Sequence, residues 1–444
     1  MSFVPTTRLL WLVFAAALVA IAAGPWAELQ PVWLLAMVGI ALTALADVAV
    51  SLARARPPVA SVPAVVRFMR DRAGAVPVTF INADARARRV RFALGLPAEF
   101  APAEEEAWVD LPAGAARARI DWRCTPKQRG RFAGVLACVE GGSALGLWRV
   151  RVRTTLACEL RVHSNLLTER KSVAAIFLAR GRPGSRVQRT LGRGREFEKL
   201  RDYLPGDGFD EIHWKATAKR GRPVTKVFQA ERTQEIYVVI DASRLSARPV
   251  VIGGVAQTAL ERCLTSALVL LLAAARQGDK FGLVAYDDRV RVFVRAGSGA
   301  GHYAACREAV LGLRASETTP DVAEIFRHLR AHLRQRALLF FLTDLTDPVL
   351  AEDFAKNARV LARQHLVLVG QLRAPEVAPL FAGAAVTTSD EVYERLAGHA
   401  RWAEARALGR KLKPLGVTTL LLEDEAMAAQ LVTQYLDVKR RQAL

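Results

Sequence analysis

The sequence predicts an α/β protein: a transmembrane helical hairpin (residues 1–56), a small antiparallel β-sandwich (57–163), a connecting segment (164–233) and a doubly wound domain with a mostly parallel sheet (234–444). Three observations predict this fold class. Two apolar segments lie within the first 53 residues, period-two alternation follows to about residue 153, and apolar strands then alternate with helical segments. The chain is also longer than one hydrophobic core usually organises.

The apolar segments are Leu9–Ala27, without a formal charge, and Val32–Ala53, interrupted only by Asp47. At about 1.5 Å per residue, each matches a hydrocarbon core of about 30 Å. A cleaved signal peptide ending near residues 20–23 is the alternative for the first segment. Because a second apolar segment follows at once, an uncleaved helical hairpin is the simpler interpretation.

The charges beside these segments predict their orientation. The stretch between them, residues 25–31, carries Glu28 and no basic residue. Five arginines follow the second segment: Arg54, Arg56, Arg67, Arg70 and Arg72. By the positive-inside rule that side is cytoplasmic. We therefore expect a two-helix protein of the cell inner membrane, in contact with the lipid bilayer, with cytoplasmic soluble domains.

Neither the overall charge nor the cysteines predict a nucleic-acid-binding surface, a cysteine metal site or a disulfide framework. The net charge is +20, but the basic residues are scattered among acidic ones, and anionic lipid headgroups offer a second partner for them. We therefore expect no nucleic acid as a partner. The five cysteines show no CxxC spacing, so neither a metal site nor a disulfide framework is predicted.

Four alternating runs predict the strands of the β domain. Turn signals at 127–130 and 141–143 separate some of them. The runs are Val76–Ile81, Arg89–Leu94, Ala118–Trp122 and Trp148–Arg153. In the connecting segment we expect a short helix over 166–179 and then a flexible connector through 180–185 and 191–194. Its glycines do not match the spacing of a phosphate-binding loop.

The last part alternates strands with helices, which is typical of a parallel sheet covered on both faces. The expected strands are 234–241, 281–286, 290–294 as a hairpin with the previous one, 337–342, 366–372 and 417–422. The expected helices are 255–277, 302–313, 321–335, 349–363, 390–413 and 425–439. In such sheets ligands bind beyond the carboxyl ends of the strands.

Polar residues stand at those ends. Asp241 closes the first strand and is followed by Ser243, Asp344 follows a later strand, and Thr318 and Thr319 precede a helix. Carboxylate and hydroxyl oxygens suit Mg²⁺ or Mn²⁺. The alternative, favoured by spacing alone, is that these residues cap the helices that follow them.

This arrangement resembles the metal-ion-dependent adhesion site of von Willebrand factor A domains. The resemblance implies Asp241, Ser243, Thr319 and Asp344 as metal ligands, with Thr318 as the alternative threonine. The first loop of that site reads Asp-Xaa-Ser-Xaa-Ser. Here Leu245 stands at the third ligand position and Ser246 comes one residue later. A leucine cannot coordinate a metal, so the site is a degenerate one.

A second resemblance covers nearly the whole chain. The segments 195–207, 212–218 and 228–231 are similar to the signature of the domain-of-unknown-function-58 family, and 127–132 and 144–148 resemble its β-domain motifs. The family has a membrane hairpin, a β domain and a von Willebrand A-like domain in this order. The signature contains six residues that could form a partner-binding or interdomain surface: Arg201, Tyr203, Asp207, His213, Trp214 and Lys215.

These features lead to three hypotheses about function. The first is a non-enzymatic, membrane-anchored binding or assembly factor, for which the resemblance implies a MoxR-type AAA+ ATPase as partner. The partner's acidic side chain would be bound directly or through a divalent ion. The second is a hydrolase that uses the strand-end carboxylates and a metal-activated water, with Asp347 as the nearest further carboxylate. The third is a membrane scaffold without a ligand.

Overall fold

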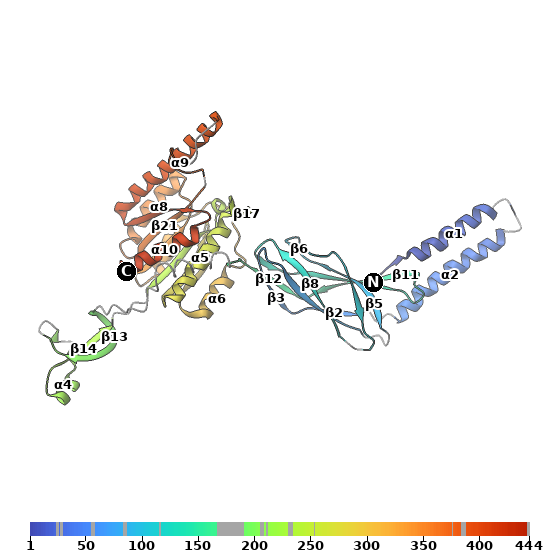
Figure 1. The fold of residues 1–444 in the computed structure, drawn as a ribbon, viewed down its shortest axis with the longest axis horizontal. Helices are drawn as coiled ribbons and strands as arrows, with labels where there is room; N and C mark the ends of the chain where they lie inside the picture. The colour runs from blue at the N-terminus through green and yellow to red at the C-terminus, as the bar shows by residue number, and fades with distance from the viewer. Residues whose placement is uncertain are drawn as a thin grey trace. The chain divides into compact units, whose positions relative to one another are not determined.

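The fold is described from a computed structural model. The structure describes residues 1–444 except 24–25, 27–29, 55–57, 83–86, 115–116, 167–190, 205–207, 210–211, 230–233, 253, 375, 383–387 and 442–444. The chain divides into two compact units, Met1–Asn165 and Leu166–Leu444. In Figure 1 the first unit runs from blue to cyan and the second from green to red.

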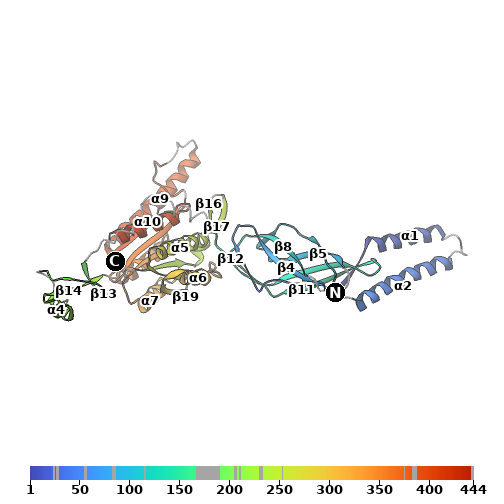
Figure 2. The same cartoon turned by 60° about the horizontal axis from the view of Figure 1, so that its bottom comes forward.

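Two apolar helices, α1 (Thr7–Ala23) and α2 (Gln30–Arg54), lie side by side in the first unit (Figures 1 and 2). Among the described residues, the span Pro31–Ala53 of α2 is long and apolar enough to cross a membrane, with a mean hydropathy of 2.1. Only 17% of its apolar window is buried. Thr7–Ile21 of α1 is a shorter apolar helix. Glu28, between the helices, lies outside the described residues.

The remainder of the first unit is a β domain. Its strands are β1 (Ser2–Pro5), β2 (Val59–Ser61), β3 (Val65–Met69), β4 (Gly74–Ile81), β5 (Arg88–Gly95), β6 (Phe100–Pro102), β7 (Ala107–Leu111), β8 (Arg117–Pro126), β9 (Gly130–Phe132), β10 (Val135–Gly142), β11 (Trp148–Leu156) and β12 (Glu159–His163). All four strands expected from the alternating pattern are present. The expected turn at 127–130 joins β8 to β9, whereas residues 141 and 142 still belong to β10.

Two antiparallel sheets of this domain share one core. The five-stranded sheet has the order β1-β11-β10-β5-β7, and the four-stranded sheet has the order β2-β4-β8-β6. Buried aromatic rings from both sheets meet edge to face, with centroids 4.9 Å apart for Phe80 and Phe92 and 5.3 Å apart for Phe92 and Trp122. These are favourable geometries for buried aromatic pairs. The apolar residues of the alternating runs therefore form the core between the two sheets.

The prediction of a purely antiparallel domain is wrong for one strand pair. In a third, small sheet β12 pairs in parallel with β3, with Glu159 opposite Val65. These strands lie at opposite ends of the domain's sequence. Because no tight hairpin joins them, their direction is set by packing and not by a turn.

The second unit begins with β13 (Leu191–Asp202), α4 (Trp214–Arg220) and β14 (Val224–Gln229). The expectation of a flexible connector at 191–194 is wrong, because β13 already begins at Leu191 and pairs antiparallel with β14. Leu191 lies opposite Gln229, 38 positions downstream, so the pairing could not be predicted from the local glycine content. The rest of that connector and the helix expected over 166–179 fall largely outside the described residues.

A six-stranded sheet forms the centre of the second unit. Its strands are β15 (Glu235–Asp241), β18 (Lys280–Tyr286), β19 (Val290–Gly297), β20 (Ala337–Leu342), β21 (Leu366–Arg373) and β22 (Val417–Glu423). The order is β19-β18-β15-β20-β21-β22, and every pair is parallel except β18–β19. Both the mostly parallel sheet and its single hairpin are therefore confirmed. The protein is a mixed α/β chain.

Helices cover both faces of this sheet (Figures 1 and 2). One face packs against α5 (Ala259–Arg276), α6 (Gly299–Ala309) and α10 (Met427–Arg440). The other packs against α7 (Val322–His332), α8 (Pro348–Leu361) and the end of α9 (Ser389–Leu412). Strand β15 is buried on both sides: Ile236 and Val238 belong to the first core, and Tyr237 and Val239 to the second.

The helix expected over 255–277 is shorter than predicted. Strands β16 (Pro249–Ile252) and β17 (Val255–Thr258) form a hairpin first, with Gly254 in its turn at φ +79°. The helix α5 then begins at Ala259, because the Thr258 hydroxyl accepts from the Glu261 N–H and caps it. The apolar pattern gave no sign of this boundary, since valine and alanine occur in both elements.

Candidate functional site

The candidate site lies where the strand order of the large sheet reverses. The chain runs from β15 to β18 on one side and then crosses to β20 on the other side of β15. In open α/β sheets, ligands bind beyond the carboxyl ends of the strands at such a point. Asp241 is the last residue of β15, and Thr343 and Asp344 directly follow β20.

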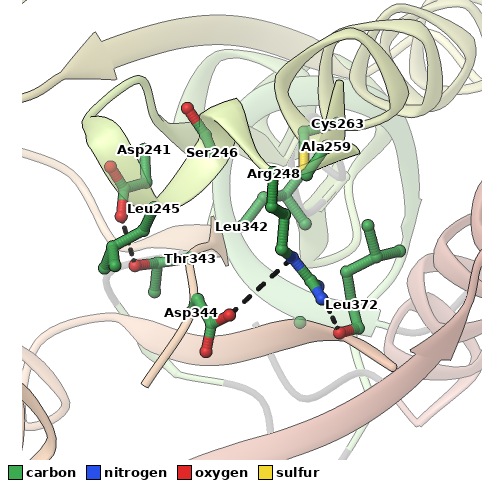
Figure 3. Close-up of a pocket in the computed structure, with 11 residues that line it drawn as sticks. Asp241, Leu245, Ser246, Arg248, Ala259, Cys263, Leu342, Thr343, Asp344 and Leu372 are labelled. Atoms are coloured by element: carbon green, nitrogen blue, oxygen red, sulfur yellow. Dashed lines mark hydrogen bonds and ion pairs between the residues drawn. The ribbon is translucent and has the colours of Figure 1, made fainter. Parts of the chain in front are cut away.

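The Asp241 carboxylate is almost fully buried and accepts hydrogen bonds on both oxygens. The Ser243 N–H donates to Oδ1 at 2.8 Å. The Thr343 hydroxyl donates to Oδ2 at 2.8 Å, as Figure 3 shows. Asp241 is 2% exposed. Burial raises the pKa of this carboxyl, and the nearby charge of Asp344 acts in the same direction, while the hydrogen bonds from Ser243 and Thr343 oppose the shift.

Asp344 lies beside a cation. The Arg248 Nε is 3.9 Å from its Oδ2, and the Arg248 Nη2 donates to the Leu372 carbonyl at 2.7 Å (Figure 3). The other oxygen of Asp344 accepts from the N–H of Thr346 at 3.0 Å and from its hydroxyl. The guanidinium therefore occupies the space between the ends of β20 and β21.

These residues line a small, shallow pocket that is open to solvent. Its polar side consists of Asp241, Ser246, Arg248, Thr343 and Asp344. Its apolar side includes Leu245, Cys263, Leu342 and Leu372. The pocket thus combines one partly exposed guanidinium, two carboxylates and two hydroxyls with apolar side chains. This combination suits recognition of a small polar group on an otherwise apolar ligand.

The loop after β15 folds around its own backbone. Ser243 caps the short 3-10 turn η3 (Arg244–Ala247), and its hydroxyl accepts from the Leu245 N–H at 3.4 Å. The Ser246 hydroxyl donates to the Ser243 carbonyl at 2.8 Å. Leu245 packs against the apolar core. Capping, the alternative favoured by spacing, is therefore an observed role of Ser243.

The two threonines are placed differently from the two aspartates. The Thr318 hydroxyl pairs with the Ser316 hydroxyl at 2.8 Å, and its carbonyl accepts from the Arg244 N–H at 3.0 Å. Thr319 is exposed. Asp241 and Asp344 line the pocket, whereas Ser243, Thr318 and Thr319 are absent from its lining. Asp347, the nearest further carboxylate, caps α8 by accepting from the Val349 N–H at 2.8 Å.

The donor set fits a divalent metal poorly. Within the described part of the chain, no group of three or more histidine, cysteine, aspartate or glutamate side chains could hold a metal ion. The hard ligands at this site are Asp241 and Asp344, supplemented by hydroxyls. Leu245 takes the place of a ligand, and the positive charge of Arg248 already lies beside Asp344. Binding of Mg²⁺ or Mn²⁺ here stays a prediction.

The residues expected to form a partner-binding or interdomain surface lie around α4. His213 is the cap of this helix, since its Nδ1 accepts from the Ala216 N–H at 3.1 Å. Trp214 is 67% exposed, and Lys215 is exposed as well. Tyr203 stacks on Phe209, with ring centroids 6.5 Å apart.

The two remaining residues of that surface are Arg201 and Asp207. The Arg201 Nη1 donates to the Asp202 carbonyl at 3.2 Å, and Asp207 lies outside the described residues. An exposed tryptophan beside an exposed lysine is compatible with partner binding, which stays a prediction for these residues.

Sequence reasoning missed two site residues, Thr343 and Arg248. Thr343 immediately precedes Asp344, so its place at a strand end was a usable signal. Arg248 offered none, because it follows the loop after β15 and reaches the ends of β20 and β21 only through the fold.

Replacing Asp241 by asparagine is expected to stabilise the fold at alkaline pH. A carboxyl whose pKa is raised by folding contributes stability below its unfolded pKa, and this is lost as pH rises through the folded-state pKa. Asparagine has no proton to lose. Asp241→Asn should therefore raise the free energy of unfolding by about 1 kcal/mol at pH 8, or about 2–4 °C in Tm. The gain should be smaller at pH 4.5.

Thermal unfolding followed by circular dichroism at both pH values tests this expectation. Asp353→Asn on the exposed face of α8 is the matched control and should change Tm little at either pH. An unchanged Tm of Asp241→Asn at pH 8, or an equal gain at both pH values, would contradict the role assigned to burial.

A protein-family model matches the part of the chain that contains the candidate site. Residues 199–396 match the model described as "Protein of unknown function DUF58". These residues belong to the DUF58 family. The match covers part of the signature segment and most of the large sheet, including β15 and β20 with Asp241, Arg248 and Asp344. The family resemblance drawn from the sequence motifs is thus confirmed, and the candidate site lies inside the DUF58 region.

Solved structures give weaker likenesses. One is a conserved hypothetical protein BatB from Bacteroides thetaiotaomicron, at 14% identity and a TM-score of 0.32, covering 47% of this chain and 99% of that one. Another is an aerotolerance-related membrane protein from Bacteroides fragilis, at 15% identity and a TM-score of 0.31, covering 46% and 98%. No curated protein matches the chain.

Proposed function

We propose that this chain is a membrane-anchored, non-enzymatic binding protein whose strand-end site binds an acidic side chain of a partner protein. The sheet domain would act as a von Willebrand A-like binding head. The observation that carries the proposal is the position of Arg248, whose guanidinium lies at the switch point between β15, β20 and β21 and lines an open pocket.

The guanidinium has capacity for a further ligand. Its contacts with Asp344 and the Leu372 carbonyl use only part of its five N–H donors, and its side chain is 33% exposed. At 3.9 Å from Nε, Asp344 is at the limit of an ion pair. Arginine binds carboxylates through two parallel hydrogen bonds, which gives a charged ligand both orientation and affinity. A partner carboxylate could therefore bind directly.

The nearby aspartates oppose such a ligand only weakly. Both oxygens of Asp241 already accept hydrogen bonds, one from the Ser243 N–H and one from the Thr343 hydroxyl. One oxygen of Asp344 is used by Thr346. Direct binding also needs no third metal ligand in place of Leu245. These features favour the guanidinium over a divalent ion as the group that contacts the partner.

The membrane anchor is supported by the exposed surface of α2. Leu35, Leu42 and Leu45 are exposed by 72%, 60% and 65%, although they belong to a helix that is long and apolar enough to cross a membrane. A core helix of a soluble protein would bury these side chains. A two-span hairpin with cytoplasmic domains is the arrangement that we propose, on the charge asymmetry of the sequence.

For the partner we propose a MoxR-type AAA+ ATPase, on the family resemblance of the signature segment. The test is a pull-down of this ATPase, from the same source organism, by the full-length tagged protein in detergent, with and without ATP. We expect nucleotide-dependent capture. No capture by the unmodified protein would reject this partner and favour a scaffold.

Two variants separate direct binding from metal-mediated binding. If Arg248 contacts the partner, Arg248→Ala should lower capture about tenfold, which corresponds to the loss of about 1.4 kcal/mol. Asp241→Asn and EDTA should then have little effect. If a divalent ion mediates binding, EDTA and Asp241→Asn should abolish capture instead, and Arg248→Ala should not weaken it.

Arg244→Ala is the matched control. Arg244 is an exposed arginine four residues away on the same loop and does not line the pocket. Equal capture by Arg248→Ala and Arg244→Ala would reject direct binding through Arg248. If EDTA and Asp241→Asn also left capture unchanged, the strand-end site would be rejected as the binding surface.

A further inference from the structure

The turn between β10 and β11, residues 143–148, makes an unusual set of contacts with the apolar helices. Asp47 of α2 is completely buried, and its carboxylate accepts from three groups of this turn: the Ser143 hydroxyl at 2.5 Å and the N–H groups of Leu145 at 2.8 Å and Leu147 at 3.2 Å. A carboxylate in an apolar helix is costly unless it is satisfied in this way.

Every backbone N–H of the turn is satisfied without solvent. Besides the two bonds to Asp47, the Ala144 N–H donates to the Ser51 hydroxyl, and the Trp148 N–H to the Ser143 hydroxyl. The remaining donors bond within the turn, from Gly146 to the Ser143 carbonyl and from Ser143 to the Trp148 carbonyl.

Two further contacts connect the turn and Trp148 to the segments that contain α1 and α2. The Thr6 hydroxyl lies 2.9 Å from the Gly146 and Leu147 carbonyls, and the Trp148 indole N–H donates to the Ala44 carbonyl at 3.0 Å. A water-exposed turn has no need of such internal pairing, whereas backbone in lipid requires it.

Apolar side chains beside the turn face outward. On α2, Ala44, Asp47 and Ser51 form one buried stripe toward the turn, as expected for residues three and seven apart. On the other faces at the same level, Leu45 and Leu52 are exposed by 65% and 52%. Leu145 in the turn itself is 60% exposed.

The lengths of the helices place the bilayer at the level of this turn. Between Ala44 and its start at Gln30, α2 has about 14 residues, or about 21 Å. A hydrocarbon core is about 30 Å thick. If the hydrocarbon core extended only from Gln30 to Ala44, it would be about 21 Å thick instead of about 30 Å. The exposed side chains of Leu45 and Leu52 would then lie in water. The bilayer therefore has to reach down alongside residues 143–148.

We propose that the β10–β11 turn is a third membrane-contacting element, with Leu145 inserted into the lipid bilayer and Trp148 near the interface, held there by Asp47. Tryptophan is enriched at this level in membrane proteins. The β domain would thereby be fixed to the bilayer surface by the turn as well as by the chain that leaves α2. This inference rests on the membrane anchor of the proposed function.

Depth-dependent fluorescence quenching tests it in the full-length protein, reconstituted in phosphatidylcholine vesicles with about 20% phosphatidylglycerol as the anionic lipid. An environment-sensitive fluorophore is attached through Leu145→Cys, and nitroxide-labelled acyl chains act as quencher. Cys138, the one native cysteine that is not buried, is replaced by serine throughout. Leu136→Cys, on the same strand β10 but about 20 Å from the turn, is the matched control.

We expect at least threefold stronger quenching at position 145 than at position 136, with blue-shifted emission. Equal quenching at both positions would overturn the inference. Added Asp47→Asn should lower the quenching at 145 toward the level at 136, and unchanged quenching would show that Asp47 does not hold the turn. Flotation of the vesicles tests the anchor separately: protein that floats without quenching at 145 overturns only this inference, and protein that fails to float overturns the anchor itself.

Discussion

Asp279→Ala is expected to lower the free energy of unfolding of the second unit by about 3 kcal/mol. Asp279 is 1% exposed and follows α5. Its Oδ2 accepts from the Lys439 ammonium at 2.7 Å and from the Tyr435 hydroxyl, and its Oδ1 accepts from the Gln234 N–H at 3.3 Å. The carboxylate thus connects α10 to the start of β15.

Removal of this carboxylate leaves the Tyr435 hydroxyl and the Gln234 N–H without their acceptor, while the Lys439 ammonium keeps only the Gln277 carbonyl at 3.3 Å. The Tyr435 hydroxyl is buried, and its pKa is raised by burial and then by the charge of Asp279. Lys439 has a side chain that is 25% exposed, so it can regain some hydration, which limits the loss. Breaking a buried ion pair by deleting one member is costly because the other charge remains.

Chemical denaturation of the purified protein measures this loss. Tyr435→Phe removes only one hydrogen bond and should cost about 1 kcal/mol. Lys439→Met removes the cation while leaving Asp279 buried, and it should cost nearly as much as Asp279→Ala. A loss below that of Tyr435→Phe for Asp279→Ala would contradict the central place of this carboxylate.

Gly282→Ala should also destabilise the second unit strongly, by about 2–3 kcal/mol. Gly282 lies in the buried strand β18. A Cβ there would be 2.5 Å from Cε1 of Tyr237 and 2.7 Å from the Val294 carbonyl oxygen. The first neighbour is a ring and the second is backbone of the adjacent strand, so neither can give way easily.

The ring of Tyr237 is fixed by its own contacts. It stacks on Phe293, with centroids 6.4 Å apart, and its hydroxyl accepts from the Ala296 N–H at 3.0 Å. Displacing the ring would break this hydrogen bond and open space in the apolar core. Gly312→Ala is the control, because a Cβ at Gly312 would meet nothing within 4 Å. Equal Tm values for the two variants would reject the steric argument.

The elements of the sheet domain were accessible from sequence, because a strand that is buried on both faces must be apolar throughout. Residues 337–342 read Ala-Leu-Leu-Phe-Phe-Leu, and all six are buried. Asp241 and Asp344 were found for a related reason. A charged residue directly after such a strand marks the edge of the sheet, and parallel strands bring their carboxyl ends to one edge.

The side chains that surround Asp241 and Asp344 could not be predicted from the sequence pattern. Arg248 reaches the carbonyl of Leu372, 124 positions away in the chain, and Thr343 donates to Asp241 across 102 positions. Such contacts depend on which strands are neighbours and on side-chain direction. Thr319 precedes α7 as expected and is exposed outside the pocket, and its role as a metal ligand stays a prediction.

For the apolar helices, too, the sequence predicted the elements but not the contacts between them and the β domain. The lengths and charges of the first 53 residues by themselves predicted two apolar helices, because hydrophobic segments of this size have few other solutions. Asp47 was visible as an anomaly, but its partners were not. Only the tertiary structure decided that it binds the turn at 143–148, about 100 residues away, because hydrogen bonding depends on spatial proximity, which a one-dimensional pattern does not contain.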